Sequence, residues 1–337
     1  MPEKRPSTSP DTIDPTLPAT AAVVGCGVIG AAWAARFRLH GVPVAAYDPS
    51  PEAARIIDEV SANAAAAWRH LGLPTDQAPV TVCNSIEEAV ADAELIQESV
   101  PEVLEIKHAT LSSIDQAARP DAVIGSSTSG LLCSDLARPL QHPERLVVAH
   151  PFNPVYLLPL VEIVGGEKTS PETISRALTL YRGLSMKPLH IKAEIEAHVA
   201  DRLLEAVWRE SLWLVKDGIA TTEEIDDAIR YGFGLRWAQM GLFETYRIAG
   251  GESGFAHFLK QFGPTLSWPW TKLMDVPDLD DELVERLEAQ SDAQSGAYSI
   301  RELERIRDHN LAAMMRALEQ NDWGAGQTVA EMRSRLG

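Results

Sequence analysis

The sequence has few cysteines, few basic residues relative to acidic ones, and no long hydrophobic run. Only three cysteines, Cys26, Cys83 and Cys133, occur in 337 residues, and neither their number nor their spacing suits a disulfide framework or a cysteine-based metal site. We therefore expect a reducing cytoplasm and no bound metal. The 30 Lys and Arg against 48 Asp and Glu leave a net charge of −18, which disfavours nucleic acid and anionic membranes as partners. No apolar stretch reaches the length of a membrane span.

The chain divides into three parts by composition and pattern. Residues 1–18 are rich in Pro, Ser, Thr and Asp and have no apolar core, which predicts a disordered tail and no signal peptide. Residues 19–195 alternate short apolar runs with helical patterns, and this predicts βαβ units in a Rossmann-like, doubly wound, mainly parallel sheet. Residues 196–330 show helical periodicity, which predicts an all-α second domain.

The strands of the first domain are predicted from the apolar runs, and the last of them can run antiparallel. They are expected at Ala21–Val24, Val44–Tyr47, Val80–Val82, Ala93–Gln97, Ala122–Gly125, Leu146–Ala149, Leu160–Ile163 and Lys187–Ile191.

A glycine-rich turn follows the first predicted strand. Its sequence is Gly25-Cys26-Gly27-Val28-Ile29-Gly30, and a helical pattern follows it. The first glycine permits a tight turn, the second lets the backbone approach a diphosphate, and the third lets helix and strand pack closely. Glycines also mark ordinary turns, but Asp48 follows the second strand, where a carboxylate suits a ribose diol and repels a 2′-phosphate. We expect the turn and Asp48 to bind NAD.

His150 and Glu162 form a candidate acid–base pair. His150 opens a His-Pro-Phe-Asn-Pro run after one predicted strand, and Glu162 lies within the next. If the chain folds back between them, the carboxylate can hold one ring nitrogen while the other takes a proton from a hydroxyl group. The alternative is a histidine that caps local structure beside a surface glutamate.

Several motifs, in order, resemble the 3-hydroxyacyl-CoA dehydrogenase family. They are the glycine turn, Ser126-Ser127-Thr128-Ser129, the His150 and Glu162 segments, and Asp201-Arg202-Leu203-Leu204. The resemblance implies that His150 is the catalytic acid/base, that Glu162 is its partner and that Ser129 donates a hydrogen bond to the substrate oxygen. It also places Glu102, Lys107 and Asn153 near the nicotinamide, and it implies a homodimer formed through the helical domain.

Asp201 departs from that family, which usually has asparagine at this position. An ionised aspartate brings negative charge and cannot donate a hydrogen bond. Two interpretations stay open. Asp201 either accepts hydrogen bonds at the start of its helix or helps the substrate site tolerate a cation.

Arg236 lies in a second stretch that departs from the acyl-CoA enzymes. Its guanidinium offers a fork to a small free carboxylate, and the segment around it resembles the family branch that oxidises free 3-hydroxy acids such as L-carnitine and L-gulonate. Carnitine carries a carboxylate and a quaternary ammonium, and the ammonium is recognised by aromatic faces. The helical domain offers six candidate aromatics, although most aromatic residues pack in cores. They are Trp237, Phe243 and Tyr246 first, then Phe233, Trp268 and Trp270.

The sequence therefore predicts an NAD-dependent dehydrogenase that oxidises the C3 hydroxyl of L-carnitine. Two alternatives stay open. The first is a dehydrogenase for a different 3-hydroxy acid, which is either L-gulonate or a 3-hydroxyacyl-CoA. The aromatic segment disfavours the polyhydroxylated gulonate, and the acidic net charge disfavours the CoA phosphates. The protein can also be a non-catalytic, crystallin-like NAD-binding protein, because fold does not fix function.

Overall fold

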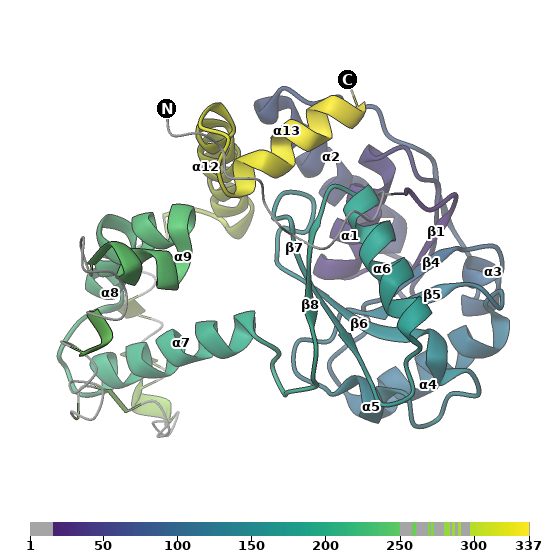
Figure 1. Cartoon of the computed structure of the whole chain (residues 1–337), viewed down its shortest axis with the longest axis horizontal. Coiled ribbons are helices and arrows are strands. Elements are labelled where there is room, and N and C mark those ends of the chain that lie inside the picture. The colour runs from purple at the N-terminus through teal and green to yellow at the C-terminus, as the bar shows by residue number, and fades with distance from the viewer. Residues whose placement is uncertain are drawn as a thin grey trace. The chain divides into compact units, whose positions relative to one another are not determined.

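The chain divides into two units. This computed structural model describes residues 16–249, 258–260, 269, 271–272, 280–283, 285–286, 289–290 and 297–336. The first unit runs to His198 and also includes residues 331–337, and the second unit is Val199–Ala330 (Figure 1). Residues 1–15 of the expected tail lie outside the described part.

The first unit is built on one sheet of eight strands. Their order is β3-β2-β1-β4-β5-β6-β7-β8, and their bounds are β1 Ala21–Val24, β2 Val44–Tyr47, β3 Val80–Val82, β4 Leu95–Glu98, β5 Val123–Ser126, β6 Leu146–Pro151, β7 Leu160–Gly165 and β8 Lys187–Ile191. Neighbouring strands are parallel as far as β6. Strand β7 runs antiparallel to β6, and β8 runs parallel to β7. The predicted Rossmann-like sheet is confirmed, and its last two strands, β7 and β8, run opposite to the others.

Helices cover both faces of this sheet (Figure 1). They are α1 Val28–Leu39, α2 Ala53–Leu71, α3 Ile86–Val90, α4 Leu104–Ala117, α5 Cys133–Leu136 and α6 Pro171–Gly183. Side chains alternate along β1, so Ala22 and Val24 join the core cluster that α3, α4 and α5 share. On the other face α1 meets α6, where the rings of Trp33 and Tyr181 lie 5.5 Å apart. Burial on both faces explains why a central strand such as β1 reads as a continuous apolar run.

Strand β4 differs from its predicted bounds. We expected Ala93–Gln97, and the strand is Leu95–Glu98. The prediction ended at Gln97 because an apolar pattern does not extend to a charged residue. Glu98 nevertheless belongs to the strand and is 0% exposed, because Lys107 binds its carboxylate at 2.9 Å. A buried charge is tolerated when it is paired in this way.

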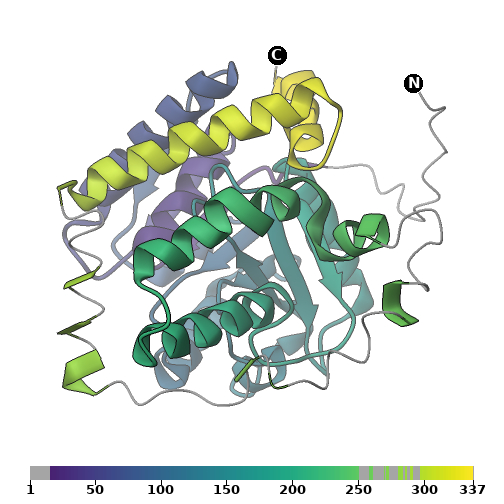
Figure 2. The same cartoon turned by 90° about the vertical axis from the view of Figure 1, so that its left-hand side faces the viewer.

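The second unit is helical in its described residues, as predicted. Its helices are α7 Ala200–Lys216, α8 Thr222–Ala228, α9 Gly234–Ala249 and α12 Ile300–Gln320, followed by the first residues of α13 Ala325–Leu336. Figure 2 shows α12 lengthwise. Thr221 caps α8 in a capping box with Glu224, which satisfies backbone N–H groups at the helix start.

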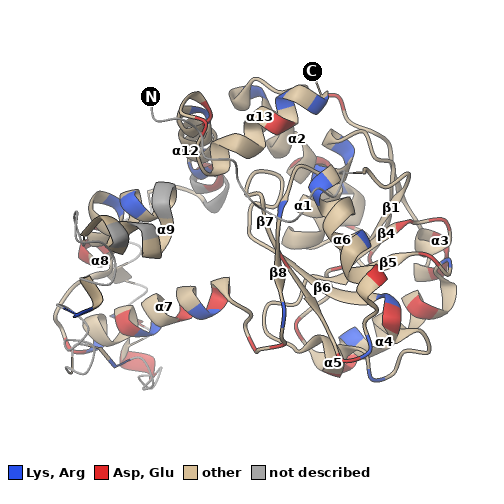
Figure 3. Cartoon of the chain, in the orientation of Figure 1, with Lys and Arg blue, Asp and Glu red and all other residues tan. Residues whose placement is uncertain are grey.

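Charged residues lie mainly on the helices and loops. Strands β1, β5 and β6 contain no Lys, Arg, Asp or Glu (Figure 3), as expected for the centre of a doubly covered sheet. Among the helices that the structure describes, none is long and apolar enough to cross a membrane.

Candidate active site

The antiparallel pairing of β6 and β7 brings His150 and Glu162 together. The two residues are direct partners in the strand register, so their side chains project from the same face. Nδ1 of His150 lies 2.9 Å from Oε2 of Glu162, and the two residues are 6% and 0% exposed. An ionised carboxylate only accepts hydrogen bonds, so with Glu162 ionised Nδ1 is the donor of this contact, and in a neutral ring Nε2 would be the acceptor.

His150 opens onto a cleft of about 300 Å³. The cleft gathers candidate residues from four separate segments of the first unit. It is lined by Ile29, Ser99, Val100, Glu102, Lys107, Ser127, Ser129, His150 and Pro151. The glycine turn contributes Ile29, the segments after β4 and β5 contribute six residues, and the end of β6 contributes His150 and Pro151. Asn153, which we also expected here, is exposed in the turn after β6 and is not among the lining residues.

The turn that carries Ser129 is organised around the carboxylate of Glu102. Oε1 of Glu102 accepts the backbone N–H groups of Ser129 and Gly130, each at 3.1 Å, and the hydroxyl of Thr128. Desolvation alone would raise the pKa of Glu102, but the Thr128 hydroxyl and the charge of Lys107 outweigh it and lower that pKa below its ordinary value. Glu102 therefore fixes Ser129 beside His150 as an ionised carboxylate.

Lys107 connects this carboxylate to a second one that the sequence analysis missed. The ammonium lies 2.9 Å from Oε1 of Glu98 and 3.4 Å from Oε2 of Glu102, and Glu98 also accepts the Ser126 hydroxyl. Lys107 is 1% exposed and Glu98 is 0% exposed. The available signal was a charged residue at the end of an apolar strand, where parallel sheets place functional groups.

The glycine turn has the geometry that a dinucleotide requires. Gly25 has φ +91°, and a Cβ there would lie 2.7 Å from the backbone of Ser99. A Cβ on Gly30 would lie 1.8 Å from the carbonyl oxygen of Gly25, whereas a Cβ on Gly27 would meet nothing within 4 Å. Helix α1 begins at Val28 and has no acidic residue in its first turn. The open space at Gly27 and the helix N-terminus therefore fit a diphosphate.

Asp48 lies directly beside this turn. Its Oδ2 accepts the backbone N–H of Cys26 at 2.7 Å, and its Oδ1 accepts that of Ser50 at 2.8 Å. Burial and the Asp48 charge raise the pKa of the Cys26 thiol to about 12, so this cysteine stays protonated and unreactive. Within the described residues no cluster of three or more His, Cys, Asp or Glu side chains could hold a metal ion.

The substrate-recognition candidates other than Ser129 belong to the second unit, and the structure defines their arrangement within that unit. Arg236, Trp237, Phe243 and Tyr246 are all exposed on α9, which is broken at Gly241 with φ +71°. The ring of Trp237 lies 4.5 Å from that of Phe233. Asp201 lies in the first turn of α7. Trp268 and Trp270 lie outside the described residues.

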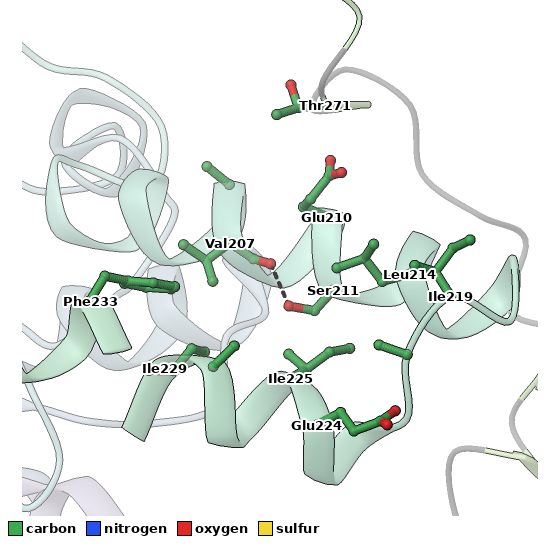
Figure 4. Close-up of a pocket in the computed structure, with 13 residues that line it drawn as sticks. Val207, Glu210, Ser211, Leu214, Ile219, Glu224, Ile225, Ile229, Phe233 and Thr271 are labelled. Atoms are coloured by element: carbon green, nitrogen blue, oxygen red, sulfur yellow. Dashed lines mark hydrogen bonds between the residues drawn. The ribbon is translucent and has the colours of Figure 1, made fainter. Parts of the chain in front are cut away.

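The second unit also contains an apolar pocket of about 500 Å³. Figure 4 shows α7 and α8 on its two sides, with Leu214 and Ile225 among the lining side chains. Its two carboxylates are engaged locally, since Glu210 accepts the N–H of Lys272 and Glu224 completes the α8 cap. It offers no pair of groups for proton transfer, so we assign the chemistry to the His150 cleft.

Comparison with known proteins defines the class. Residues 20–195 match the family description "3-hydroxyacyl-CoA dehydrogenase, NAD binding domain", and residues 198–300 match "3-hydroxyacyl-CoA dehydrogenase, C-terminal domain". The chain belongs to the 3-hydroxyacyl-CoA dehydrogenase family, and the resemblance predicted from the sequence is confirmed. Its first domain is the NAD-binding domain of that family.

Individual relatives narrow the comparison. An L-carnitine dehydrogenase/betainyl-CoA thioesterase of Agrobacterium fabrum is 61% identical over 94% of this chain, and this chain spans 65% of that protein's length. An L-carnitine dehydrogenase of Mesorhizobium japonicum is 58% identical over 94% of this chain and 89% of its own. A crystal structure of FHMPC 5-dehydrogenase, described as an NAD+-dependent dismutase, has a TM-score of 0.75 and 29% identity, covering 89% of this chain and 98% of that one.

Proposed function

We propose that this protein oxidises the C3 hydroxyl of L-carnitine to a ketone, with NAD as the hydride acceptor. The observation that carries the proposal is the His150–Glu162 pair, which faces one cleft with the glycine turn and the Ser129 turn. The substrate is supported by relatives at 58–61% identity that are named for L-carnitine dehydrogenation. The three free cysteines, all buried, are consistent with a cytoplasmic enzyme.

His150 would act as the general base. Its neutral ring takes the C3 hydroxyl proton on Nε2 while Glu162 holds Nδ1–H, and the carboxylate stabilises the imidazolium that forms. Ser129 donates a hydrogen bond to the same substrate oxygen and steadies it as the carbonyl develops. The glycine turn would hold the diphosphate of NAD and Asp48 its adenosine ribose, and bound NAD would supply the hydride acceptor for C3. Glu102 and Lys107 would border that ring, with Asn153 at the nearby turn.

Arg236 would bind the substrate carboxylate as a bidentate partner. Trp237, Phe243 and Tyr246 are exposed on the same broken helix. Trp237 packs on Phe233 and Tyr246 stacks on Phe258, and aromatic faces attract a quaternary ammonium. Asp201 adds negative charge that tolerates a cationic substrate. The roles on α9 are supported by resemblance to the family branch that oxidises free 3-hydroxy acids and by the exposure of the α9 side chains. The role of Asp201 is supported by its charge, and a homodimer formed through the helical unit by family resemblance.

The reaction is tested by NADH absorbance with L-carnitine, D-carnitine, L-gulonate and 3-hydroxybutyryl-CoA in parallel. L-carnitine should be oxidised far faster than the other three compounds, with NAD preferred to NADP. A protein that oxidises L-gulonate or the acyl-CoA instead would overturn the substrate assignment, and a protein that binds NAD without oxidising any of them would fit a non-catalytic role.

Charge recognition is tested with Arg236→Ala. We expect the KM for L-carnitine to rise roughly ten- to hundredfold, which corresponds to about 1.5–3 kcal/mol for lost hydrogen bonds to a charged group. The matched control is Arg230→Ala, because Arg230 is an exposed arginine that already pairs with Asp227. A carnitine isostere with a tert-butyl group in place of trimethylammonium should bind more weakly. Equal KM values in both arginine variants would contradict the assignment of Arg236.

A further inference from the structure

His198, the last residue of the first unit, lies against the catalytic pair. It is 1% exposed, and its ring centroid is 5.6 Å from that of His150, with the planes at 49°. Phe152 meets the same His150 ring edge-on at 5.3 Å. The orientation of the His150 ring is therefore set by Glu162 at Nδ1 and by two packed rings.

The same His198 side chain reaches the turn that carries Ser129. Its Nε2 lies 3.3 Å from the carbonyl oxygen of Thr128. A carbonyl only accepts hydrogen bonds, so Nε2 carries the proton and donates. Glu102 binds the N–H groups of Ser129 and Gly130. The turn is thus held at its carbonyl by His198 and at its N–H groups by Glu102.

The backbone at this corner is held in a costly conformation. Ala197 and His198 have φ values of +59° and +50°, in the left-handed region that residues other than glycine rarely adopt. Such residues persist where the surroundings hold them, and they cluster at functional sites. Here this conformation places the buried His198 ring against His150 and against the turn that carries Ser129, the two groups that would bind the reacting hydroxyl.

We propose that His198 is a positioning residue for the reaction. By holding the Thr128 carbonyl and packing on His150, it sets the separation between Ser129 and the His150 base, so that one substrate oxygen can contact both. This inference rests on the proposed function of the His150 cleft. It assigns to His198 no proton transfer and no contact with substrate.

The test compares His198→Phe, which keeps a ring and removes the donor, with His198→Gln, which keeps an N–H donor near the Nε2 position. His198→Phe should lower kcat for L-carnitine roughly ten- to hundredfold, as expected for a misplaced reacting group, with KM and NAD affinity within about twofold. His198→Gln should recover most of kcat. The control is His190→Phe, because His190 is exposed on β8, and it should match the unmodified protein. A kcat retained in His198→Phe, or not rescued in His198→Gln, would overturn the proposal.

A double-mutant cycle with Ser129→Ala separates positioning from a general loss of structure. If His198 acts through the Ser129 turn, His198→Phe should cost less in the Ser129→Ala background than alone. Additive losses would overturn the proposal while leaving the enzyme assignment intact. If the unmodified protein oxidises another 3-hydroxy acid of the panel instead of L-carnitine, the same cycle is run on that compound. If it oxidises none, both the function and this inference fall.

Discussion

Gly27 and Gly30 belong to one motif, yet an alanine should impair NAD binding at Gly27 and stability at Gly30. A Cβ at Gly30 would lie 1.8 Å from a backbone oxygen, and a Cβ at Gly27 would meet nothing within 4 Å. Gly27 has φ −68°, a value that alanine adopts readily. We therefore expect the Gly27→Ala protein to fold normally and to bind NAD more weakly. Gly30→Ala should instead disrupt the strand-to-helix turn and lower the Tm.

The size of the binding defect in Gly27→Ala follows from the space that its Cβ would occupy. The added methyl would stand where the diphosphate approaches the N-terminus of α1, and overpacking of this kind costs about 1–3 kcal/mol. At about 1.4 kcal/mol per tenfold change, NAD affinity should fall roughly 5- to 150-fold. Calorimetric titration measures the affinity, and thermal unfolding without NAD serves as the control for folding. An unchanged NAD affinity in a folded Gly27→Ala protein would refute this placement of the diphosphate.

Three further predictions concern the cofactor, the chemistry and the pH dependence of stability. Asp48→Ala should weaken NAD binding and reduce the preference of the enzyme for NAD over NADP in initial-rate assays. Equal use of both cofactors by the unmodified protein would contradict the assignment of Asp48 to the ribose. His150→Ala should lose nearly all turnover at almost unchanged NAD affinity, and Glu162→Gln should slow turnover because a neutral amide stabilises an imidazolium poorly; a His150→Ala protein with most of its rate would refute the assignment. Burial, aided by the charge of Arg36, lowers the pKa of His40 from 6.5 to about 3, so below pH 6.5 the unfolded chain takes up a proton that the folded protein does not. As the pH falls between those two pKa values, the free energy of unfolding should decrease by up to about 1.4 kcal/mol per pH unit. Urea titrations at pH 7 and pH 5 measure this decrease, which should be smaller in a folded His40→Leu variant than in the unmodified protein.

The sheet could be predicted because its physical signal is local. Four strands, β1, β2, β3 and β8, have their predicted bounds. Strand β1 is buried along its whole length, and a short apolar run between helical patterns is sufficient to define such a strand. The edge strands β3 and β8 were also predicted, although most of their residues are exposed. The sequence predicted the His150–Glu162 contact only on the condition that the chain folds back between the two strands. The antiparallel register of β6 and β7, which makes the two residues direct partners, came from the structure, because a register depends on the geometry of the turn between the strands, which their apolar runs do not contain.

The contacts among the supporting groups could not be predicted, because they join residues from different elements and most of these residues are distant in sequence. Glu98 pairs with Lys107 from the following helix, and Glu102 reaches the Ser129 turn from 27 positions away. His198 contacts Thr128 across 70 positions, and a buried histidine in a left-handed corner has no periodicity to mark it. Burial of such groups depends on satisfaction by these remote partners, which a local pattern does not contain.

The charges of the cleft also explain how one site can serve both directions of the proposed reaction. The carboxylates of Glu98 and Glu102 flank the ammonium of Lys107, and Glu162 lies on His150. If NAD binds as proposed, with its nicotinamide beside Glu102 and Lys107, the oxidation would add one positive charge to His150 and remove one from the cofactor, so the total charge of the cleft would stay constant. Glu162 would stabilise the charge on His150, and the two carboxylates around Lys107 would stabilise the charge of the oxidised cofactor. Neither direction would then require the site to reorganise around a new charge.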